Sequence, residues 1–198
     1  MSNLKKILID KKNCKSLWFM RQAGRYLPEF RKIRSQNKNF INLCLNSELS
    51  SEITLQPINR FDIDSAIIFS DILMVPYALG QRVNFIKDHG PQLSTFNLNQ
   101  FLSNDKISFS QKLHPIYKAI EITRKKLDKK KSLIGFAGAP FTVAAYMIEG
   151  KGNITFPKCV SFFKNNEKIF LLLLEKLESF IANHLIKQID AGAEIIQI

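Results

Sequence analysis

Short, continuous apolar runs alternate along the chain with longer segments in which apolar residues have a helical spacing. The short runs are the predicted strands, and they cover residues 17–20, 66–69, 133–136 and 194–198. A continuous run, rather than an alternation of apolar and polar residues, is typical of a strand that is buried on both faces of a parallel sheet. The pattern therefore predicts an α/β fold built on a parallel sheet.

The longer segments have apolar residues three or four positions apart, which predicts amphipathic helices. Asn46 or Ser47 is the predicted N-cap of one of them, and Pro57 is expected to kink or shorten it. His184, on the last helix, is expected at the surface or at the edge of the core. The predicted helices cover residues 28–35, 46–61, 111–127, 156–163 and 167–189, and residues 80–94 predict a hairpin-like excursion with a turn at residues 89–91.

Two architectures place helices around a parallel sheet: the open doubly wound sheet and the (β/α)8 TIM barrel. No G-x-G-x-x-G sequence follows the first predicted strand, which disfavours a dinucleotide-binding sheet. Four strands with their helices make half of an eight-unit barrel, so residues 1–198 are expected to form a single domain, the N-terminal part of a (β/α)8 barrel. A naked edge at the last strand would promote aggregation. We therefore expect further chain, or a partner, after Ile198, and no activity from these 198 residues alone.

Composition narrows the class of protein. The chain has 198 residues, of which 45% are hydrophobic and 23% charged, which is typical of a globular domain. No apolar run approaches the roughly 18–20 residues of a membrane span, and the N-terminus lacks the apolar core of a secretory signal, so a cytoplasmic protein without a membrane partner is expected. Three widely spaced cysteines predict reduced thiols rather than disulfides or a cysteine-based zinc site.

The net charge of +12 raises the question of an anionic partner. Residues 118–131 hold seven Lys or Arg and two acidic residues, so much of the excess charge lies at the end of one predicted helix. Lysines in a last helical turn complement the helix dipole, and no aromatic residues interleave there as a base-stacking surface requires. We therefore expect no nucleic-acid partner, whereas a highly anionic small substrate fits the charge.

Two arginines, Arg21 and Arg25, flank Gly24 directly after the first predicted strand. Ligands of parallel α/β proteins bind beyond the carboxyl ends of the strands, and guanidinium groups suit the two-point capture of a carboxylate or phosphate. Gly24 is expected to let the backbone approach a ligand closely or to adopt a positive φ. The competing interpretation makes both arginines structural, paired with Asp62, Asp64 or Glu29.

Polar residues also follow the other strands. Asp71 comes just after the run at residues 66–69, where it is expected to face either a pocket or a salt bridge. Tyr146 lies beyond the glycine-containing turn that follows residues 133–136. A tyrosine between apolar neighbours is often a core residue with a satisfied hydroxyl, so both interpretations stay open for it.

In this order, these residues resemble the uroporphyrinogen decarboxylase family. The stretch "MRQAGRYLPEFR" is similar to the first signature of that family, "AIIFSDIL" to its central aspartate segment, and "GFAGAPFTVAAYMIEGKG" to its second signature. "CLNSELSSEITLQPINRF" is also similar to an early helix of the family. The resemblance runs from about residue 17 to the last residue.

The resemblance implies a (β/α)8 barrel, usually a homodimer, that needs no cofactor or metal and converts uroporphyrinogen III to coproporphyrinogen III by removing four acetate carboxylates. It implies that Arg21 and Arg25 bind substrate carboxylates and that Arg21 also moves protons. The backbone of Gln22, Ala23 and Gly24 would line the cleft. Asp71 would accept hydrogen bonds from the pyrrole N–H groups, and Tyr146 would contact the substrate.

Two alternatives remain beside this interpretation. One is a methyltransferase of the same superfamily that uses a corrinoid or zinc, and the other is a non-catalytic half-barrel that binds a tetrapyrrole. The serine and histidine that the family carries in the second half of its pocket have no counterpart in these residues. This absence underlies the expectation that the 198 residues alone are inactive.

Overall fold

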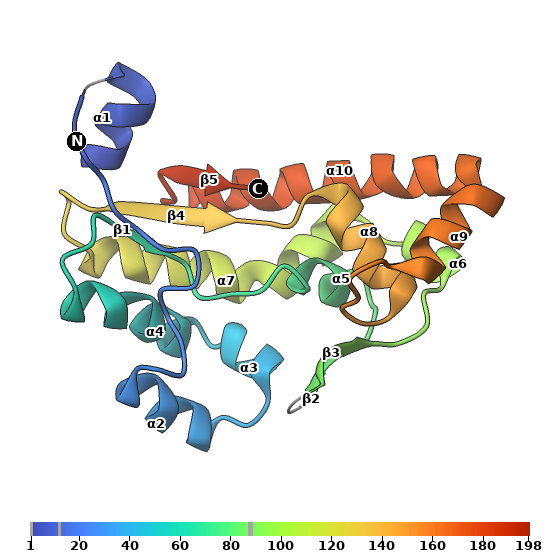
Figure 1. Cartoon of the computed structure of the whole chain (residues 1–198), viewed down its shortest axis with the longest axis horizontal. Helices are drawn as coiled ribbons and strands as arrows, with labels where there is room; N and C mark the ends of the chain where they lie inside the picture. Colours follow the sequence, from blue (N-terminus) through green and yellow to red (C-terminus); the bar gives the residue numbers. More distant parts are fainter. Residues whose placement is uncertain (1, 12, 87–88) are drawn as a thin grey trace. The chain divides into compact units, whose positions relative to one another are not determined.

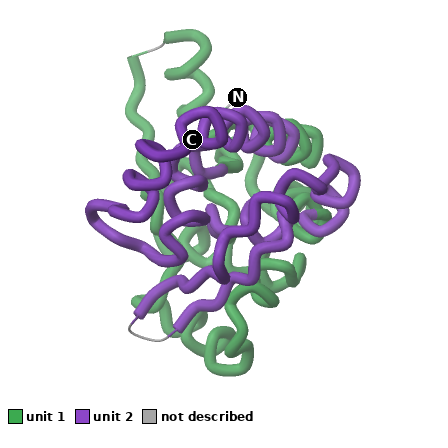
Figure 2. The backbone as a smooth tube through the Cα atoms, turned by 90° about the vertical axis from the view of Figure 1, so that its right-hand side faces the viewer, with its two compact units in different colours: residues 1–70, 114–136, 185–197 green, residues 71–113, 137–184, 198 purple. Residues whose placement is uncertain are grey.

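The computed structural model describes residues 2–11, 13–86 and 89–198, which divide into two compact units. Unit 1 contains the described residues of 1–70, 114–136 and 185–197, and unit 2 contains those of 71–113 and 137–184 together with residue 198 (Figure 2). The long helices α7 (Lys106–Lys126) and α10 (Glu167–Asp190) contribute residues to both units.

Unit 1 is built on a parallel sheet with the strand order β1-β4-β5 (Figure 1). The strands are β1 (Ser65–Ile67), β4 (Ser132–Phe136) and β5 (Ile195–Gln197). They confirm the predicted parallel sheet and three of the four predicted strands. The side chains of β1 and of most of β4 are buried, as in sheets covered on both faces, whereas those of β5 are only half-buried.

The prediction of a strand at residues 17–20 is wrong. Leu17, Phe19 and Met20 are 50%, 56% and 61% exposed. The Asp64 N–H donates a hydrogen bond to the Leu17 carbonyl at 2.8 Å, but within the described part of the chain residues 18–20 form no ladder with a neighbouring strand. An apolar run becomes a strand only where a neighbour pairs with its successive backbone groups, and here pairing stops after one residue.

Four helices lie in the N-terminal part of unit 1: α1 (Asn3–Asp10), α2 (Pro28–Gln36), α3 (Phe40–Cys44) and α4 (Ser47–Arg60). Asn46 is the N-cap of α4, as predicted, and its side chain accepts a hydrogen bond from the Leu49 N–H. Pro57 lies inside α4, and the helix continues to Arg60, so the expected shortening at Pro57 is wrong.

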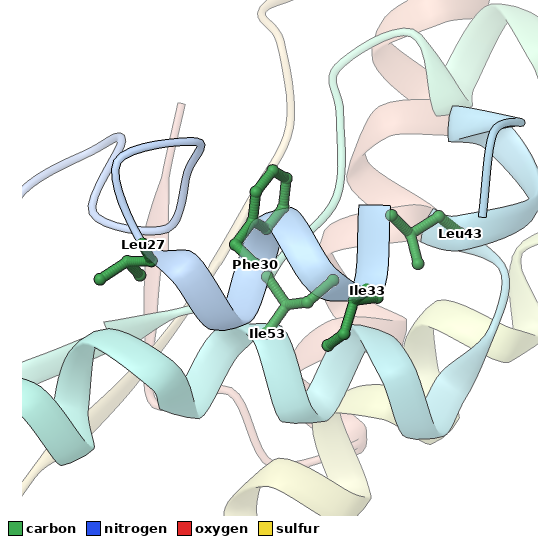
Figure 3. Close-up of a cluster of buried hydrophobic side chains, with 5 residues drawn as sticks. All are labelled: Leu27, Phe30, Ile33, Leu43 and Ile53. Carbon is green, nitrogen blue, oxygen red and sulfur yellow. The ribbon is translucent and has the colours of Figure 1, made fainter. Parts of the chain in front are cut away.

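A compact hydrophobic cluster joins α2 to α4 (Figure 3). Phe30 and Ile33 lie three positions apart on α2 and belong to the same buried cluster as Ile53 of α4, which is fully buried. Leu27, just before α2, and Leu43 of α3 complete the cluster. Because Leu27 belongs to it, this cluster fixes the end of the segment that contains Arg21 and Arg25.

Unit 2 combines short helices with a two-stranded hairpin. Its elements are α5 (Met74–Ala78), β2 (Val83–Ile86), β3 (Gly90–Leu93), α6 (Leu98–Leu102), α8 (Pro140–Glu149) and α9 (Pro157–Asn165). The antiparallel pairing of β2 with β3 confirms the predicted hairpin, in which Lys87 and Asp88 lie outside the described residues.

His184 is a core residue of unit 2, so its expected place at the surface or the edge of the core is wrong. It is 4% exposed, and its ring meets the Phe109 ring edge-on at 6.3 Å between centroids. Phe109 in turn contacts Phe180 at 5.0 Å. Burial among apolar groups disfavours the charged imidazolium and lowers the pKa of His184 to about 4 from its ordinary 6.5.

Removing side-chain volume from the α2–α4 cluster should destabilise the protein. Replacing Ile53 by alanine leaves a cavity between α2 and α4, and we expect a loss of about 2–5 kcal/mol in the free energy of unfolding. Ile53→Val, the control, removes one methyl group and should cost about 0.5–1.5 kcal/mol. Urea unfolding followed by circular dichroism measures both, and equal midpoints for Ile53→Ala and the unaltered protein would contradict the assignment of Ile53 to the core.

Buried His184 should make the protein less stable in mild acid. The unfolded chain takes up a proton near pH 6.5 that the folded chain accepts only near pH 4, so the stabilisation is complete above pH 6.5 and decreases as the pH falls toward 4. The loss should reach about 1 kcal/mol near pH 5.5 and about 3 kcal/mol below pH 4. Urea unfolding at several pH values measures it. His184→Leu should flatten this part of the profile, and an unchanged slope in that variant would disprove the role of His184.

Candidate functional site

Gln22 anchors the loop that carries the two arginines. Its side chain is buried, and its Nε2 donates a hydrogen bond to the Ser65 carbonyl at 3.0 Å, at the first residue of β1. Its Oε1 accepts a hydrogen bond from the Phe19 N–H at 3.2 Å. One amide therefore ties the loop both to the sheet and to its own beginning. The sequence suggested only a backbone role for Gln22, and this side-chain role was missed because Ser65 is 43 positions away.

The other end of the loop is also fixed. The Leu27 N–H donates to the Gly24 carbonyl at 3.0 Å and closes a turn, and the Leu27 side chain is buried in the α2–α4 cluster. The Tyr26 hydroxyl donates to the Gln22 carbonyl, and the half-buried Ala23 packs against the same cluster. The backbone of residues 22–27 is thus held in place, which lowers the entropic cost of binding a ligand there.

Arg21 and Arg25 are exposed, and neither guanidinium forms an ion pair with any described residue. The three acids that could have neutralised them have other partners. These are Lys131 for Asp62 at 3.6 Å, the Leu17 N–H for Asp64 at 2.7 Å, and Arg60 for Glu29 at 3.0 Å. The alternative in which these acids pair with Arg21 and Arg25 is therefore wrong, and two positive charges on a fixed loop face solvent.

Gly24 lies between these charges without a positive φ, so that part of the prediction is wrong. A Cβ atom added to Gly24 would meet only the Tyr26 ring, at 3.7 Å, which is an ordinary van der Waals distance. Neither backbone conformation nor packing within the described chain requires a glycine here. The missing side chain leaves the backbone between Arg21 and Arg25 open to a ligand.

Unit 2 contains the other two candidate residues. Asp71 is half-buried, and its Oδ1 accepts a hydrogen bond from the Leu73 N–H at 2.9 Å, while its carbonyl accepts one from the Met74 N–H at 3.1 Å. These bonds form the turn that leads into α5 and orient the carboxylate.

The chain that leads into Asp71 is held by α4, through side chains that the sequence interpretation missed. Ser50 donates a hydrogen bond to the Phe69 carbonyl at 2.7 Å, and the Phe69 N–H donates to Thr54 Oγ1 at 2.8 Å. Both residues are buried, and Thr54 also donates to the Ser50 carbonyl at 2.7 Å. The sequence feature that indicates this role is a pair of hydroxyl residues, Ser50 and Thr54, which lie four positions apart and beside Ile53 on the buried part of the helix.

Gly138 permits a close approach between the loop of Asp71 and the start of α8. A Cβ atom on Gly138 would lie 3.0 Å from Val143 Cγ2 and 3.2 Å from the Cβ of Ile72, the residue after Asp71. A side chain at position 138 would therefore push these two segments apart. In this way unit 2 brings the loop of Asp71 against the helix that carries Tyr146.

Tyr146 is half-buried on α8, and its ring meets the Phe156 ring edge-on at 5.4 Å between centroids. Among the residues that the structure describes, none forms a hydrogen bond with its hydroxyl. Tyr146 therefore differs from the core tyrosine with a satisfied hydroxyl that was the alternative. Arg21–Arg25 belong to unit 1, and Asp71 and Tyr146 belong to unit 2.

The basic end of α7 has structural partners. Arg124 pairs with Glu194 at 2.7 Å and also donates hydrogen bonds to the carbonyls of Leu127, Asp128 and Lys131. These contacts satisfy backbone carbonyls of the turn that follows α7. Part of the net positive charge thus has a structural role, unlike the charge on Arg21 and Arg25.

Within residues 2–11, 13–86 and 89–198, no three or more His, Cys, Asp or Glu side chains gather in an arrangement that could hold a metal ion. In the same residues, every helix is too short or too polar to cross a membrane.

Comparison with known proteins gives a consistent result. The family model described as "Uroporphyrinogen decarboxylase (URO-D)" matches residues 12–198. A uroporphyrinogen decarboxylase of Chelativorans sp. (strain BNC1) is 44% identical over 182 residues, which cover 92% of this chain and 53% of the relative. One of Neorickettsia sennetsu is 47% identical over 191 residues, which cover 96% of this chain and 57% of the relative. The chain thus spans about half the length of the curated relatives it matches.

A solved structure supports the fold class. A methyltransferase from Methanosarcina mazei has a TM-score of 0.74 and 14% sequence identity, and the match covers 99% of this chain and 58% of that protein. At this identity the likeness shows the fold alone, an α/β fold with a parallel sheet, and it gives no support to a methyltransferase activity.

The contribution of the two Gln22 side-chain hydrogen bonds to stability can be tested by substitution, with a substitution of Gly24 as the control. Gln22→Leu leaves the Ser65 carbonyl and the Phe19 N–H without these partners, so the free energy of unfolding should fall by about 1–3 kcal/mol. Gly24→Ala, the control, should change it by less than about 0.5 kcal/mol, because the added methyl group has room. Chemical unfolding measures both variants. Equal losses in the two would mean that Gln22 does not anchor the loop.

Proposed function

The chain belongs to the uroporphyrinogen decarboxylase family, and we propose that the protein that carries it removes the four acetate carboxyl groups of uroporphyrinogen III to give coproporphyrinogen III. The observation that carries this proposal is the pair of exposed arginines, Arg21 and Arg25, without an ion-pair partner among the described residues on a loop of fixed backbone. A substrate with eight carboxylates supplies the ion-pair partners that Arg21 and Arg25 lack among the described residues.

Arg21 and Arg25 act in this proposal as receptors for substrate carboxylates. A guanidinium offers two parallel N–H donors to one carboxylate, which fixes the orientation of the bound group as well as its position. The backbone of Gln22, Ala23 and Gly24 lines the binding site, and the missing side chain of Gly24 lets the macrocycle approach. Arg21 also takes part in proton transfer, and Tyr146 contacts the substrate through its hydroxyl.

Asp71 stabilises the charge that develops during the reaction. A proton first adds to a pyrrole ring carbon, which makes the ring cationic. The bond between the acetate methylene and its carboxylate then breaks, CO₂ leaves, and the bonding electrons neutralise the ring. Loss of the added ring proton and protonation of the methylene carbon give a methyl group. A fixed carboxylate under the macrocycle favours the cationic intermediate, as an oxyanion hole favours an anion.

We assign this chemistry to a (β/α)8 barrel to which the present chain contributes β1, β4 and β5. The proposal includes a homodimer in the cytoplasm that uses no cofactor or metal. Because the chain spans about half of its relatives, the activity is proposed for the full natural polypeptide rather than for these 198 residues by themselves.

The experiment that tests the proposal is the substitution Asp71→Asn in the full natural polypeptide. Asparagine keeps the Oδ1 atom that accepts the Leu73 N–H, so the turn into α5 should persist while the charge is lost. We expect kcat/KM for uroporphyrinogen III to fall by about 10²–10³-fold, with an unchanged melting temperature. Chromatography of the oxidised porphyrin products measures turnover.

Asp190→Asn, which removes an exposed acid at the end of α10, is the matched control and should leave turnover unchanged. Full activity in Asp71→Asn would overturn the role of Asp71. Failure of the unaltered protein to release CO₂ from uroporphyrinogen III would overturn the proposed function itself.

A further inference from the structure

Glu149 is a buried acid at the end of α8, the helix that carries Tyr146. It is 3% exposed, and both of its carboxylate oxygens accept hydrogen bonds. Oε1 accepts one from the Asn153 side chain at 3.1 Å, and Oε2 accepts one from the Lys158 backbone N–H at 2.9 Å. A buried carboxylate requires such bonds to compensate for its lost hydration, so they determine where the group lies.

The N-terminus of α9 depends on this carboxylate, because it has no cap of its own. Phe156, the N-cap residue, provides no side-chain hydrogen bond, and the next residue, Pro157, has no N–H. The Lys158 N–H is therefore the first donor of the helix. An acidic oxygen at this point satisfies that donor and complements the positive end of the helix dipole. Glu149 thus connects the end of α8 to the start of α9.

The segment between these two helices is attached at further points. Gly150 ends α8 with a φ of 80°, and its carbonyl accepts a hydrogen bond from the Leu93 N–H at 2.7 Å. Lys151 forms an isolated bridge with Gln92 of the hairpin. Asn153, held by Glu149, accepts a hydrogen bond from the Thr155 N–H at 3.3 Å. Residues 150–156 therefore form a closed loop whose middle and end both depend on Glu149.

This loop is the surface against which Tyr146 rests. The Phe156 ring meets the Tyr146 ring at 5.4 Å, and Phe156 has a left-handed backbone with a φ of 44°, which residues other than glycine rarely adopt. A Cβ atom on Gly152 would lie 3.6 Å from Cε1 and 3.7 Å from the hydroxyl oxygen of Tyr146. Gly152 and Phe156 lie between Glu149 and Lys158, the residues whose bond closes the loop.

We infer that Glu149 is a positioning residue that holds the Tyr146 hydroxyl where it meets the substrate; this rests on the proposed function for the identity of that substrate. The hydroxyl has no hydrogen-bond partner among the described residues, so packing alone sets its direction. The packing comes from Phe156 and Gly152. Their places depend on the two hydrogen bonds of the Glu149 carboxylate.

The first test observes Tyr146 directly and needs no activity. The full natural polypeptide is labelled with 3-fluorotyrosine, and the fluorine resonance of Tyr146 is assigned by its absence in Tyr146→Phe. Glu149→Gln, which keeps the size of the side chain but removes its charge and one acceptor oxygen, should shift or broaden this resonance. Glu178→Gln, an exposed acid on α10 and the matched control, should leave it unchanged. An unmoved resonance in Glu149→Gln would overturn the inference whatever the activity.

The second test is a double-mutant cycle measured by turnover of uroporphyrinogen III. Glu149→Gln should lower kcat/KM by roughly 10- to 100-fold when Tyr146 is present, because a small displacement of a substrate-contacting group is costly. In the Tyr146→Phe background the same change should cost less than about threefold, since Glu149 acts through the missing hydroxyl. Independent, multiplying effects would show a merely structural role and overturn the inference.

The inference stays testable if the Glu149→Gln variant does not fold or if the unaltered protein is inactive. If Glu149→Gln does not fold, Asn153→Ala removes the Oε1 partner together with the Thr155 bond, keeps the Lys158 bond, and should move the Tyr146 resonance in the same direction. If the unaltered protein does not convert uroporphyrinogen III, the proposed function fails, and the fluorine resonance by itself still decides whether Glu149 positions Tyr146.

Discussion

Side chains complete the hydrogen bonds that the short parallel strands cannot make among themselves, and the structure of unit 1 depends on this. The three strands of the sheet are three to five residues long, so many of their terminal N–H and carbonyl groups lie beyond the ladder. A buried backbone group without a partner is costly. At the carboxyl end of β4, the Gln188 side chain donates to the Phe136 carbonyl and accepts from the Phe136 N–H, both at 2.9 Å.

The same requirement determines which neighbouring residues are allowed. A Cβ atom on Gly135 would lie 2.5 Å from Gln188 Oε1, so the glycine makes room for the amide that completes the strand. Gln22 serves the start of β1, and Ser50 and Thr54 serve Phe69 just beyond its end. The hydrogen bonds that satisfy the strand ends therefore also position the loop of Arg21 and Arg25 and the chain that enters Asp71.

The arginines of the candidate site differ from several other charged residues in having no ion-pair partner among the described residues. Glu29 and Asp62 are engaged by other groups, in the pairs Glu29–Arg60 and Asp62–Lys131. Each pair has one exposed and one half-buried partner, and such surface pairs contribute little to stability. Their consequence for Arg21 and Arg25 is greater, because two uncompensated guanidinium groups on a fixed backbone bind an anionic ligand with little reorganisation. In unit 2 the buried carboxylate of Glu149 has the opposite role, since both of its oxygens accept hydrogen bonds from groups inside the protein.

The sequence by itself determined the class of the fold, five of the described helices, three of the strands and the family, because periodicity and contiguous motifs are local properties. It also identified Arg21, Arg25, Asp71 and Tyr146 as candidate site residues, since each follows a predicted strand in a family signature. Only the tertiary structure decided that residues 17–20 are not a strand and that His184 is buried. It likewise revealed the roles of Gln22, Ser50 and Glu149. An apolar run shows that a segment can be buried, and a polar residue shows that it can form a hydrogen bond. Which partner it meets is decided by residues distant in the sequence, because backbone groups buried by folding must find donors and acceptors wherever the chain brings them.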